Sequence, residues 1–414
     1  MQGESFRFIH ASDFHLENPL GELDSLPSHI RDVLTTAPWE AAKEVFEAAL
    51  AENVDFVVLC GDLLNPTTAG PRGLAMLLEY FDRLNQKSTP VFWAAGIADD
   101  PSQWPESATL PSNVTLFSKD TVMSVPVMRG DRTLCHVVGR SCDGRNVLNV
   151  PGFTVEPTDH FTVGVGYGSS DADALAEGRF DYWALGGKHN RHVVDGGATA
   201  GAIYCGAPQG RDFNECGPHG YTIVDVDADQ NARIHEIECD KIRYCHVDID
   251  AAELGTASNV KNLMGERVSR LMRDNAGRHL LIGWDISVAN GDMLQMVGDS
   301  EELLTWARRE YGHGSPAAWT LDVRVRPPHS YPQAWFDEET ILGDFLRVTA
   351  EHSKKDSRDI NLSPFTEEHE GILSTTATLL AEVSSANRKE IMDQATLLGV
   401  ELLRGGKPQL VQKS

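Results

Sequence analysis

The sequence predicts an α/β fold, either a layered sandwich or a wound sheet. Short apolar runs alternate with helical patterns through the first half of the chain, which is typical of this class. Each apolar run ends in a loop that carries Asp, His or Gly, and open α/β sheets place their binding sites at such strand ends. The length of 414 residues exceeds what one hydrophobic core usually serves, so we expect two or three units.

In the first half, two segments have apolar side chains at helical spacing, and we expect helices at residues 38–52 and 73–85. The apolar runs between and after these helices are short and are best explained as buried strands. Strands are therefore expected at residues 6–11, 55–60, 90–95, 161–166, 182–186, 201–205 and 220–226.

The pattern changes near Asp240, where shorter strand and helix signals predict a smaller α/β unit. Its expected elements are strands at 243–249, 279–288 and 319–326 and helices at 259–274 and 300–311. The remaining C-terminal residues have a mainly helical pattern, and their apolar side chains either pack on their own core or dock a partner. The apolar side chains of this part include Leu379, Leu380, Val383, Ile391, Leu397, Leu398, Leu402 and Leu403. We thus predict three domains, at residues 1–239, 240–330 and 331–414.

The composition indicates a cytoplasmic protein. The first residues lack the basic and then apolar pattern of a signal peptide, and no apolar run approaches the roughly 18 residues needed to span a bilayer. Seven cysteines, with no CxxC pair, fit a reducing compartment better than a disulfide scaffold.

The net charge of −25 is concentrated in the first half. Residues 1–239 hold 16 Lys and Arg against 34 Asp and Glu, a balance of −18, whereas residues 240–414 have a balance of −7. Nucleic-acid binding depends on Lys and Arg that neutralise phosphates, so this half is not expected to bind DNA tightly by itself. A solubility or salt adaptation explains the acidity equally well.

Three strand-end loops carry candidate metal ligands. Asp13 and His15 form a D-x-H triplet, Asp62 follows Gly61 after a buried strand, and His189 follows the strand at 182–186. Most D-x-H triplets lie on surfaces by accident, and a lone His is more often a hydrogen-bonded residue than a ligand. The occurrence of three such loops in order favours a shared metal site.

These loops belong to a series of motifs that resembles a known family. HASDFHL, VVLCGDLL, FWAAGIADD, VGVGYG and YWALGGKHNR resemble, in order, the five motifs of the calcineurin-like metallophosphoesterases. The segment YCGAPQGRDFNECGPHGYTIVDVD further resembles DNA-repair exonucleases of the SbcD and YhaO type. This resemblance implies a four-layer sandwich of two sheets flanked by helices, then a small α/β cap and a helical tail.

The resemblance also implies that two ions of the Mn²⁺ type bind side by side, and it indicates their ligands. Asp13, His15, Asp62 and His189 are expected around the first ion, with Asp62 as a bridge to the second and with Asp62 and His189 as the catalytic positions. The chain departs from the family at the remaining ligands of the second ion, where it has Ile97, Tyr167 and Gly187. Ala98 stands where the family has its catalytic His. One carboxylate cannot hold a divalent ion, so the second site is expected to be empty and the activity weak or absent.

Other side chains near these motifs are candidate substitutes for the lost groups. Tyr167 offers a hydroxyl, Lys188 a positive charge and Asp99 a carboxylate, while Asp100 and His192 lie nearby in the sequence. An alternative explanation for these departures from the family is mutational drift after catalysis was no longer needed. Cys60, beside Gly61, is better explained as a small buried apolar residue than as a thiol ligand.

Three functions remain open on the sequence. The first is a nuclease that works with an SbcC-like coiled-coil ABC ATPase and binds DNA mainly with that partner. The second is a non-catalytic scaffold or regulator of such an ATPase. The third is a phosphodiesterase for small nucleotides, a function that is more compatible with an acidic surface than DNA binding is. Relatives of the SbcD type also make a homodimer a reasonable expectation.

Overall fold

The computed structural model describes residues 3–18, 20, 26–105, 108–153, 158–250, 260–288, 297, 299–326, 331–354 and 385–404. The chain divides into two compact units, which are described separately. The first unit is Met1–Cys245 with Gly277–Leu280, and the second is His246–Ala276 with Leu281–Ser414. The sequence-based domain boundaries remain predictions.

The first sheet of the first unit has a parallel centre. In spatial order it contains β12 (Ala232–Glu238), β11 (Gly220–Val226), β1 (Phe6–Ala11), β2 (Phe56–Cys60), β3 (Val91–Ala94) and β4 (Val114–Leu116). β1 to β4 run parallel, and β11 pairs antiparallel with both β1 and β12. Ile9 of β1 lies opposite Val57 of β2 on one side and Ile223 of β11 on the other.

The second sheet repeats this plan. It contains β5 (Met123–Arg129), β6 (Arg132–Gly139), β7 (Phe161–Tyr167), β8 (Tyr182–Gly186), β10 (Gly201–Tyr204) and β9 (His192–Val193). β6, β7, β8 and β10 are parallel, while β5 and β9 are antiparallel edge strands. The carboxyl ends of the parallel strands therefore meet at one edge of each sheet, as open α/β sheets require for a shared site.

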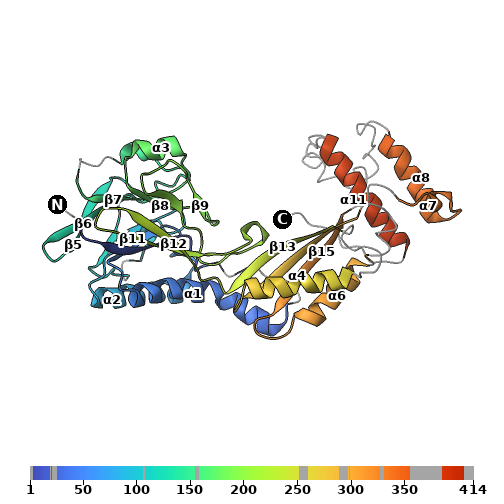
Figure 1. Cartoon of the computed structure of the whole chain (residues 1–414), viewed down its shortest axis with the longest axis horizontal. Helices are drawn as coiled ribbons and strands as arrows, with labels where there is room; N and C mark the ends of the chain where they lie inside the picture. The colour runs from blue at the N-terminus through green and yellow to red at the C-terminus, as the bar shows by residue number, and fades with distance from the viewer. Residues whose placement is uncertain are drawn as a thin grey trace. The chain divides into compact units, whose positions relative to one another are not determined.

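The two sheets pack face to face around an apolar core, in which the rings of Phe8 and Phe56 stack with centroids 4.7 Å apart. Helices α1 (Ser28–Ala51) and α2 (Gly70–Gln86) cover the other face of the first sheet, and α3 (Ala172–Glu177) lies against the other face of the second. Figure 1 shows these helices on opposite sides of the strands. The predicted four-layer arrangement of two sheets flanked by helices is confirmed.

Strands buried on both faces were predicted well, because they appear in sequence as continuous apolar runs. Every residue of β2, β7 and β8 is buried. The sequence analysis missed β4, β5, β9 and β12, which are exposed or half-buried over most of their length. It also missed β6, although most of this strand is buried. It also expected the first helix to begin at residue 38, whereas α1 starts at Ser28 and continues through Pro38.

The second unit contains the predicted three-stranded sheet, formed by β13 (Ile242–Asp250), β14 (His279–Ser287) and β15 (Ala318–Arg326), although the first residues of β13 belong to the first unit. Helices α4 (Val260–Asp274) and α6 (Ser300–Tyr311) are also present where the sequence predicted them. Beyond the sheet, α8 (Ile341–Lys354) packs against α7 (Gln333–Asp337) and α11 (Ser385–Leu403).

The predicted helical character of the C-terminal part is confirmed by α7, α8 and α11. Leu397 and Thr396 of α11 are buried, whereas Leu402 and Leu403 are exposed. Leu379, Leu380 and Val383 lie outside the described residues. Among the helices that the structure describes, none combines the length and apolar character needed to cross a membrane.

Candidate metal centre

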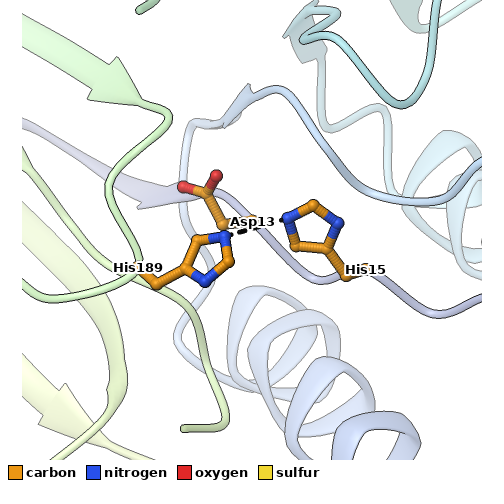
Figure 2. Close-up of side chains that lie close together, drawn as sticks. All are labelled: Asp13, His15 and His189. Carbon is orange, nitrogen blue, oxygen red and sulfur yellow. Dashed lines mark hydrogen bonds between the residues drawn. The ribbon is translucent and has the colours of Figure 1, made fainter. Parts of the chain in front are cut away.

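Three of the four predicted first-ion ligands converge at the carboxyl ends of the strands. Asp13 and His15 lie in the loop after β1, and His189 lies after β8. One ligand atom from each lies within 4.8 Å of the other two, although the residues are up to 176 positions apart in the chain. Figure 2 shows the rings of His15 and His189 facing each other beside Asp13, with His189 on a different segment from the other two residues.

The backbone of these loops is held in an unusual conformation. Asp13, His15 and Asp62 have φ values of 57°, 44° and 54°, in the left-handed region that residues other than Gly seldom adopt. The loops after β1 and β2 are joined by hydrogen bonds from the amide of Asp13 to the carbonyl of Gly61 and from that of His15 to the carbonyl of Asp62, both 2.9 Å. Backbone strain of this kind concentrates at functional sites.

The two imidazoles face each other through their Nε2 atoms, which are 3.1 Å apart. Their other ring nitrogens contact carboxylates: Nδ1 of His15 lies 3.2 Å from Glu17, and Nδ1 of His189 lies 2.6 Å from Glu215. An ionised carboxylate can only accept, so each Nδ1 carries the proton. In the neutral form of each ring, Nε2 is then the unprotonated nitrogen that a metal ion can bind.

The pKa values reflect these contacts. The hydrogen bond to Glu215 raises the pKa of His189. Burial by itself would raise the pKa of Glu215, but the hydrogen bond and charge of His189 outweigh burial and lower it. Burial raises the pKa of Asp13 to about 6, although a 2.5 Å hydrogen bond from the Ser12 hydroxyl acts in the opposite direction.

The residues present fit a divalent cation. Two imidazole nitrogens and a carboxylate form an ordinary donor set for such an ion. Two nitrogens each bound at about 2.1 Å lie about 3 Å apart when they subtend a right angle at the ion, and the Nε2 atoms are 3.1 Å apart. The carboxylates of Glu17 and Glu215 add negative charge around the imidazoles, which also favours a cation.

Asp62, the fourth predicted ligand, lies beside this group but outside it. Its Oδ2 atom is 3.6 Å from Nε2 of His15. Both of its carboxylate oxygens accept hydrogen bonds from the protein: Oδ1 from the amide of Ala98 at 2.7 Å, and Oδ2 from the hydroxyl of Tyr167 at 2.6 Å. The side chain that should bridge two ions is thus bonded to two protein donors.

The Tyr167 ring is packed closely against three glycines of the strand-end loops. A Cβ atom added to Gly61, Gly96 or Gly187 would lie 2.5, 2.7 or 3.1 Å from an atom of this ring. Gly187 also donates its amide to both oxygens of Asp13 at 3.1 Å. Ile97, by contrast, is 48% exposed.

Asp99 is a structural acceptor. Its buried carboxylate accepts hydrogen bonds from the amides of Asp62, Leu63 and Gly96 and from the indole N–H of Trp93, at 2.5–3.1 Å. Burial and the nearby charge of Asp62 raise the pKa of Asp99 to about 7. These contacts hold the loops after β2 and β3 together and leave the carboxylate directed at the protein.

The other candidate substitutes lie away from the three ligands. Nζ of Lys188 lies over the Tyr204 ring, 4.3 Å from its centroid, and His192 is exposed next to the same ring. Asp100 accepts hydrogen bonds from the amide and hydroxyl of Ser102 in a surface turn. Cys60 is fully buried in β2, and burial raises the pKa of its thiol far above its usual value.

The second unit has another group with metal-ligand chemistry, formed by His246, Asp248 and Asp285. Here Arg326 already supplies a cation, because its guanidinium donates to Asp248 at 2.9 Å and to Asp285 at 3.0 Å. His246 and Asp248 are exposed. This group is therefore an ion-pair network on the sheet surface.

Sequence reasoning missed Glu17, Glu215 and Arg211. Glu17 follows His15 by two residues, and this spacing within the same strand-end loop was an available signal. Glu215 is 26 residues from His189, and nothing in that spacing suggests their contact. Arg211 donates to the carbonyls of Phe14 and His15 at 2.7 and 3.0 Å, which only the folded chain reveals.

The chain is similar to known proteins over part of its length. The chain is 29% identical over 239 residues to a curated protein of Bacillus subtilis (strain 168) described as an uncharacterized metallophosphoesterase, YhaO. That match covers 53% of this chain and 57% of the relative's length. A solved structure, TT1561 of Thermus thermophilus, shares 11% identity with a TM-score of 0.33, over 56% of this chain and 98% of the other.

The family model described as calcineurin-like phosphoesterase matches residues 6–193. This segment contains β1 to β9 and all of Asp13, His15, Asp62 and His189. Residues 6–193 are therefore similar in sequence to the calcineurin-like phosphoesterases.

Proposed function

We propose that this protein is a phosphoesterase that uses one divalent ion, Mn²⁺, held by Asp13, His15 and His189 with Asp62 at its edge. The observation that carries the proposal is the convergence of the two Nε2 atoms, 3.1 Å apart, beside the buried carboxylate of Asp13. A bound ion at this place polarises a phosphoryl oxygen and acidifies a water molecule.

The chain's own residues prepare the site for that chemistry. When the rings are neutral, the contacts with Glu17 and Glu215 favour the proton on Nδ1, so that Nε2 of His15 and of His189 is the nitrogen that binds the ion. The amide of Gly187 orients the Asp13 carboxylate by donating to both of its oxygens. The ligands are thus aligned before an ion arrives.

We further propose that no second ion binds. The hydroxyl of Tyr167 and the amide of Ala98 take up the oxygens of Asp62 that would face it. Ile97 and Ala98 offer no side-chain donor atoms. A pair of ions normally stabilises both the attacking and the leaving oxygen, and a general acid or base contributes about 10²- to 10⁴-fold. With Ala98 in the position of the catalytic His, we expect hydrolysis to be slow.

The substrate class that we propose is a phosphodiester, as in the SbcD and YhaO lineage of DNA-repair exonucleases. The support is the resemblance of residues 204–227 to that lineage and the similarity to YhaO. An SbcC-like coiled-coil ABC ATPase is the expected partner, with the helices after residue 331 as its docking segment. The charge balance of residues 1–239 is −18, which disfavours DNA binding by this half alone. We therefore propose that DNA binds only when the partner is present. A homodimer is also proposed on the resemblance alone.

The alternative function is a non-catalytic scaffold for the same kind of ATPase. One specific observation favours it: Asp62, the residue shared by both ions in the family, is engaged by two protein hydrogen-bond donors. A phosphodiesterase for small nucleotides is the third candidate, and the acidic first half agrees with it.

The deciding experiment combines a metal count with a substrate comparison. Elemental analysis of the purified chain should give one ion, and Asp13→Ala should reduce this to zero. Manganese-dependent hydrolysis of linear DNA, cyclic nucleotides and bis(p-nitrophenyl) phosphate is then measured with and without the ATPase. Cleavage of DNA that Asp13→Ala abolishes supports the nuclease, whereas no turnover together with recovery of the ATPase in a pull-down supports the scaffold. Two ions per chain would contradict the proposed site.

A further inference from the structure

Glu17 and Glu215 make equivalent contacts on the two sides of the candidate metal centre. Each places one carboxylate oxygen on the Nδ1 atom of a histidine, at 3.2 Å for Glu17 and 2.6 Å for Glu215. Each places its other oxygen on a backbone amide, that of Asn65 at 3.0 Å or that of Arg211 at 2.8 Å. Each carboxylate therefore joins a histidine ring to the backbone, and Oε1 of Glu17 also accepts from the side-chain amide of Asn18 at 3.3 Å.

Both side chains are nearly inaccessible, with exposed fractions of 5% for Glu17 and 11% for Glu215. A buried carboxylate is costly unless its oxygens are hydrogen-bonded. Here one oxygen of each pair is fixed by the backbone, so the second oxygen is held at a defined position against the imidazole. The arrangement constrains the orientation of each ring as well as its tautomer.

The segment that carries Arg211 and Glu215 is hydrogen-bonded to both histidines. Arg211, whose amide bonds Glu215, also extends its guanidinium to the carbonyls of Phe14 and His15 at 2.7 and 3.0 Å. The segment after β10 is in this way bonded both to the His189 ring and to the loop that carries His15. A shift of this segment would change the separation of the two Nε2 atoms.

We propose that Glu215 and Glu17 are positioning residues that set the metal affinity of the centre through the Nδ1 atoms of His189 and His15. A carboxylate that accepts from the distal ring nitrogen fixes the tautomer and increases the basicity of the nitrogen that binds metal, and loss of such a contact typically costs about 10- to 100-fold in affinity. Glu215 has the shorter bond and the link to Arg211, so it is expected to matter more than Glu17. The inference rests on the proposed binding of one ion.

The test is calorimetric titration of the full-length protein with Mn²⁺. Glu215→Ala should raise the Kd about 10- to 100-fold, and Glu17→Ala should raise it by a smaller factor. Glu215→Gln should recover part of the affinity, because its amide oxygen can still accept from Nδ1 of His189. In the zinc-loaded protein, long-range ¹H–¹⁵N spectra should show the proton on Nδ1 of His189 in the wild type and an altered pattern in Glu215→Ala.

Asp212→Ala provides the matched control. Asp212 stabilises the same turn by accepting from the amide of Asn214 at 2.7 Å, and its side chain is exposed. If Asp212→Ala weakens Mn²⁺ binding as much as Glu215→Ala does, the integrity of the turn explains the effect and the inference is wrong. Unchanged affinity in Glu215→Ala also overturns it. A wild-type protein that binds no ion overturns the proposed metal function itself, which is a distinct result.

Discussion

The hydroxyl of Tyr167 donates a hydrogen bond of 2.6 Å to Oδ2 of Asp62, the atom of that carboxylate that lies 3.6 Å from Nε2 of His15. An aromatic side chain thus binds the carboxylate at the edge of the candidate ion site. Burial and the charge of Asp62 raise the pKa of Tyr167 far above its usual value, so the phenol remains protonated and acts as a donor. This pair is the basis of our proposal that no second ion binds.

Removal of this hydroxyl should destabilise the protein without adding an ion. Tyr167→Phe leaves Oδ2 of Asp62 without its donor, and an unsatisfied buried acceptor costs about 1–3 kcal/mol. Urea unfolding in EDTA measures the loss. The metal count should stay at one, since the ring still fills the space between Gly61 and Gly96. An increase to two ions in Tyr167→Phe would show that the hydroxyl alone had blocked the second site.

Recovery of the second site requires several changes together. Ile97→Asn, Ala98→His, Tyr167→His and Gly187→His introduce the missing donors and remove the ring that blocks them. The expected result is a metal count near two and a clear rise in phosphodiesterase activity, measured on bis(p-nitrophenyl) phosphate. Gly187→His by itself should instead destabilise the fold, because position 187 has φ of +96° and such strain costs about 1–3 kcal/mol.

Metal binding should stabilise the folded chain. At a Mn²⁺ concentration 100 times the Kd, the free energy of unfolding should rise by about 2.7 kcal/mol over the value in EDTA. Asp13→Asn should abolish most of this increase, because it removes the carboxylate of the centre. His246→Ala is the control, since His246 belongs to the ion-pair network of the second unit. If His246→Ala also removed the stabilisation, the ion would bind elsewhere than proposed.

The roles of the adjacent residues Asp99 and Asp100 should differ sharply. Asp99→Ala leaves the buried amides of Asp62, Leu63 and Gly96 without an acceptor, and each lost bond costs about 1–3 kcal/mol. We expect a decrease of several kcal/mol in the free energy of unfolding. Asp100→Ala, in a surface turn, should change it by no more than about 0.5 kcal/mol. Equal effects of the two substitutions would contradict the structural role assigned to Asp99.

His10 should make stability dependent on pH. Burial, assisted by the charge of Arg191, lowers the pKa of His10 to about 3, and the neutral ring contacts the Tyr182 hydroxyl at 3.0 Å. The unfolded chain binds a proton at this residue below about pH 6.5, whereas the folded chain does not until about pH 3. Stability therefore falls as the pH decreases from 6.5 toward 3. Between pH 7 and 5 the contribution is about 2 kcal/mol.

Urea unfolding in EDTA at the two pH values checks this expectation. His10→Gln should be less stable than the wild type at pH 7 but should lose about 2 kcal/mol less on acidification, because it has no imidazole to protonate. A variant whose stability decreases as steeply as that of the wild type would show that other groups cause the acid sensitivity.

The sequence was sufficient to predict the parts of the fold that are buried on both faces. Strands such as β2 and β8 appear as uninterrupted apolar runs, so their positions and the loops after them were correct. Edge strands such as β5 and β12 face solvent, and their mixed composition does not differ from that of loops. Helix α1 extends ten residues before Pro38, because packing of Ile30 and Leu34 overrides the local preference of proline.

The site was predictable at the level of which loops meet, but its contacts were not. Asp13, His15 and His189 could be selected because each follows a buried strand. The bond between Tyr167 and Asp62 joins residues 105 positions apart, and the contact of Glu215 with His189 depends on the path of the segment after β10. Such pairings arise from tertiary structure, and neither spacing nor residue type indicates them.

The glycines around the Tyr167 ring constrain how this protein could change over generations. While the ring is present, a side chain at position 187 would contact it closely, and the backbone there would have to keep its left-handed conformation. A side chain at position 96 would contact both the ring and Asp62. A side chain can therefore be introduced at position 187 or 96 only after the tyrosine ring has been replaced by a smaller group. The packing of this one ring decides in which order substitutions around the candidate site are tolerated.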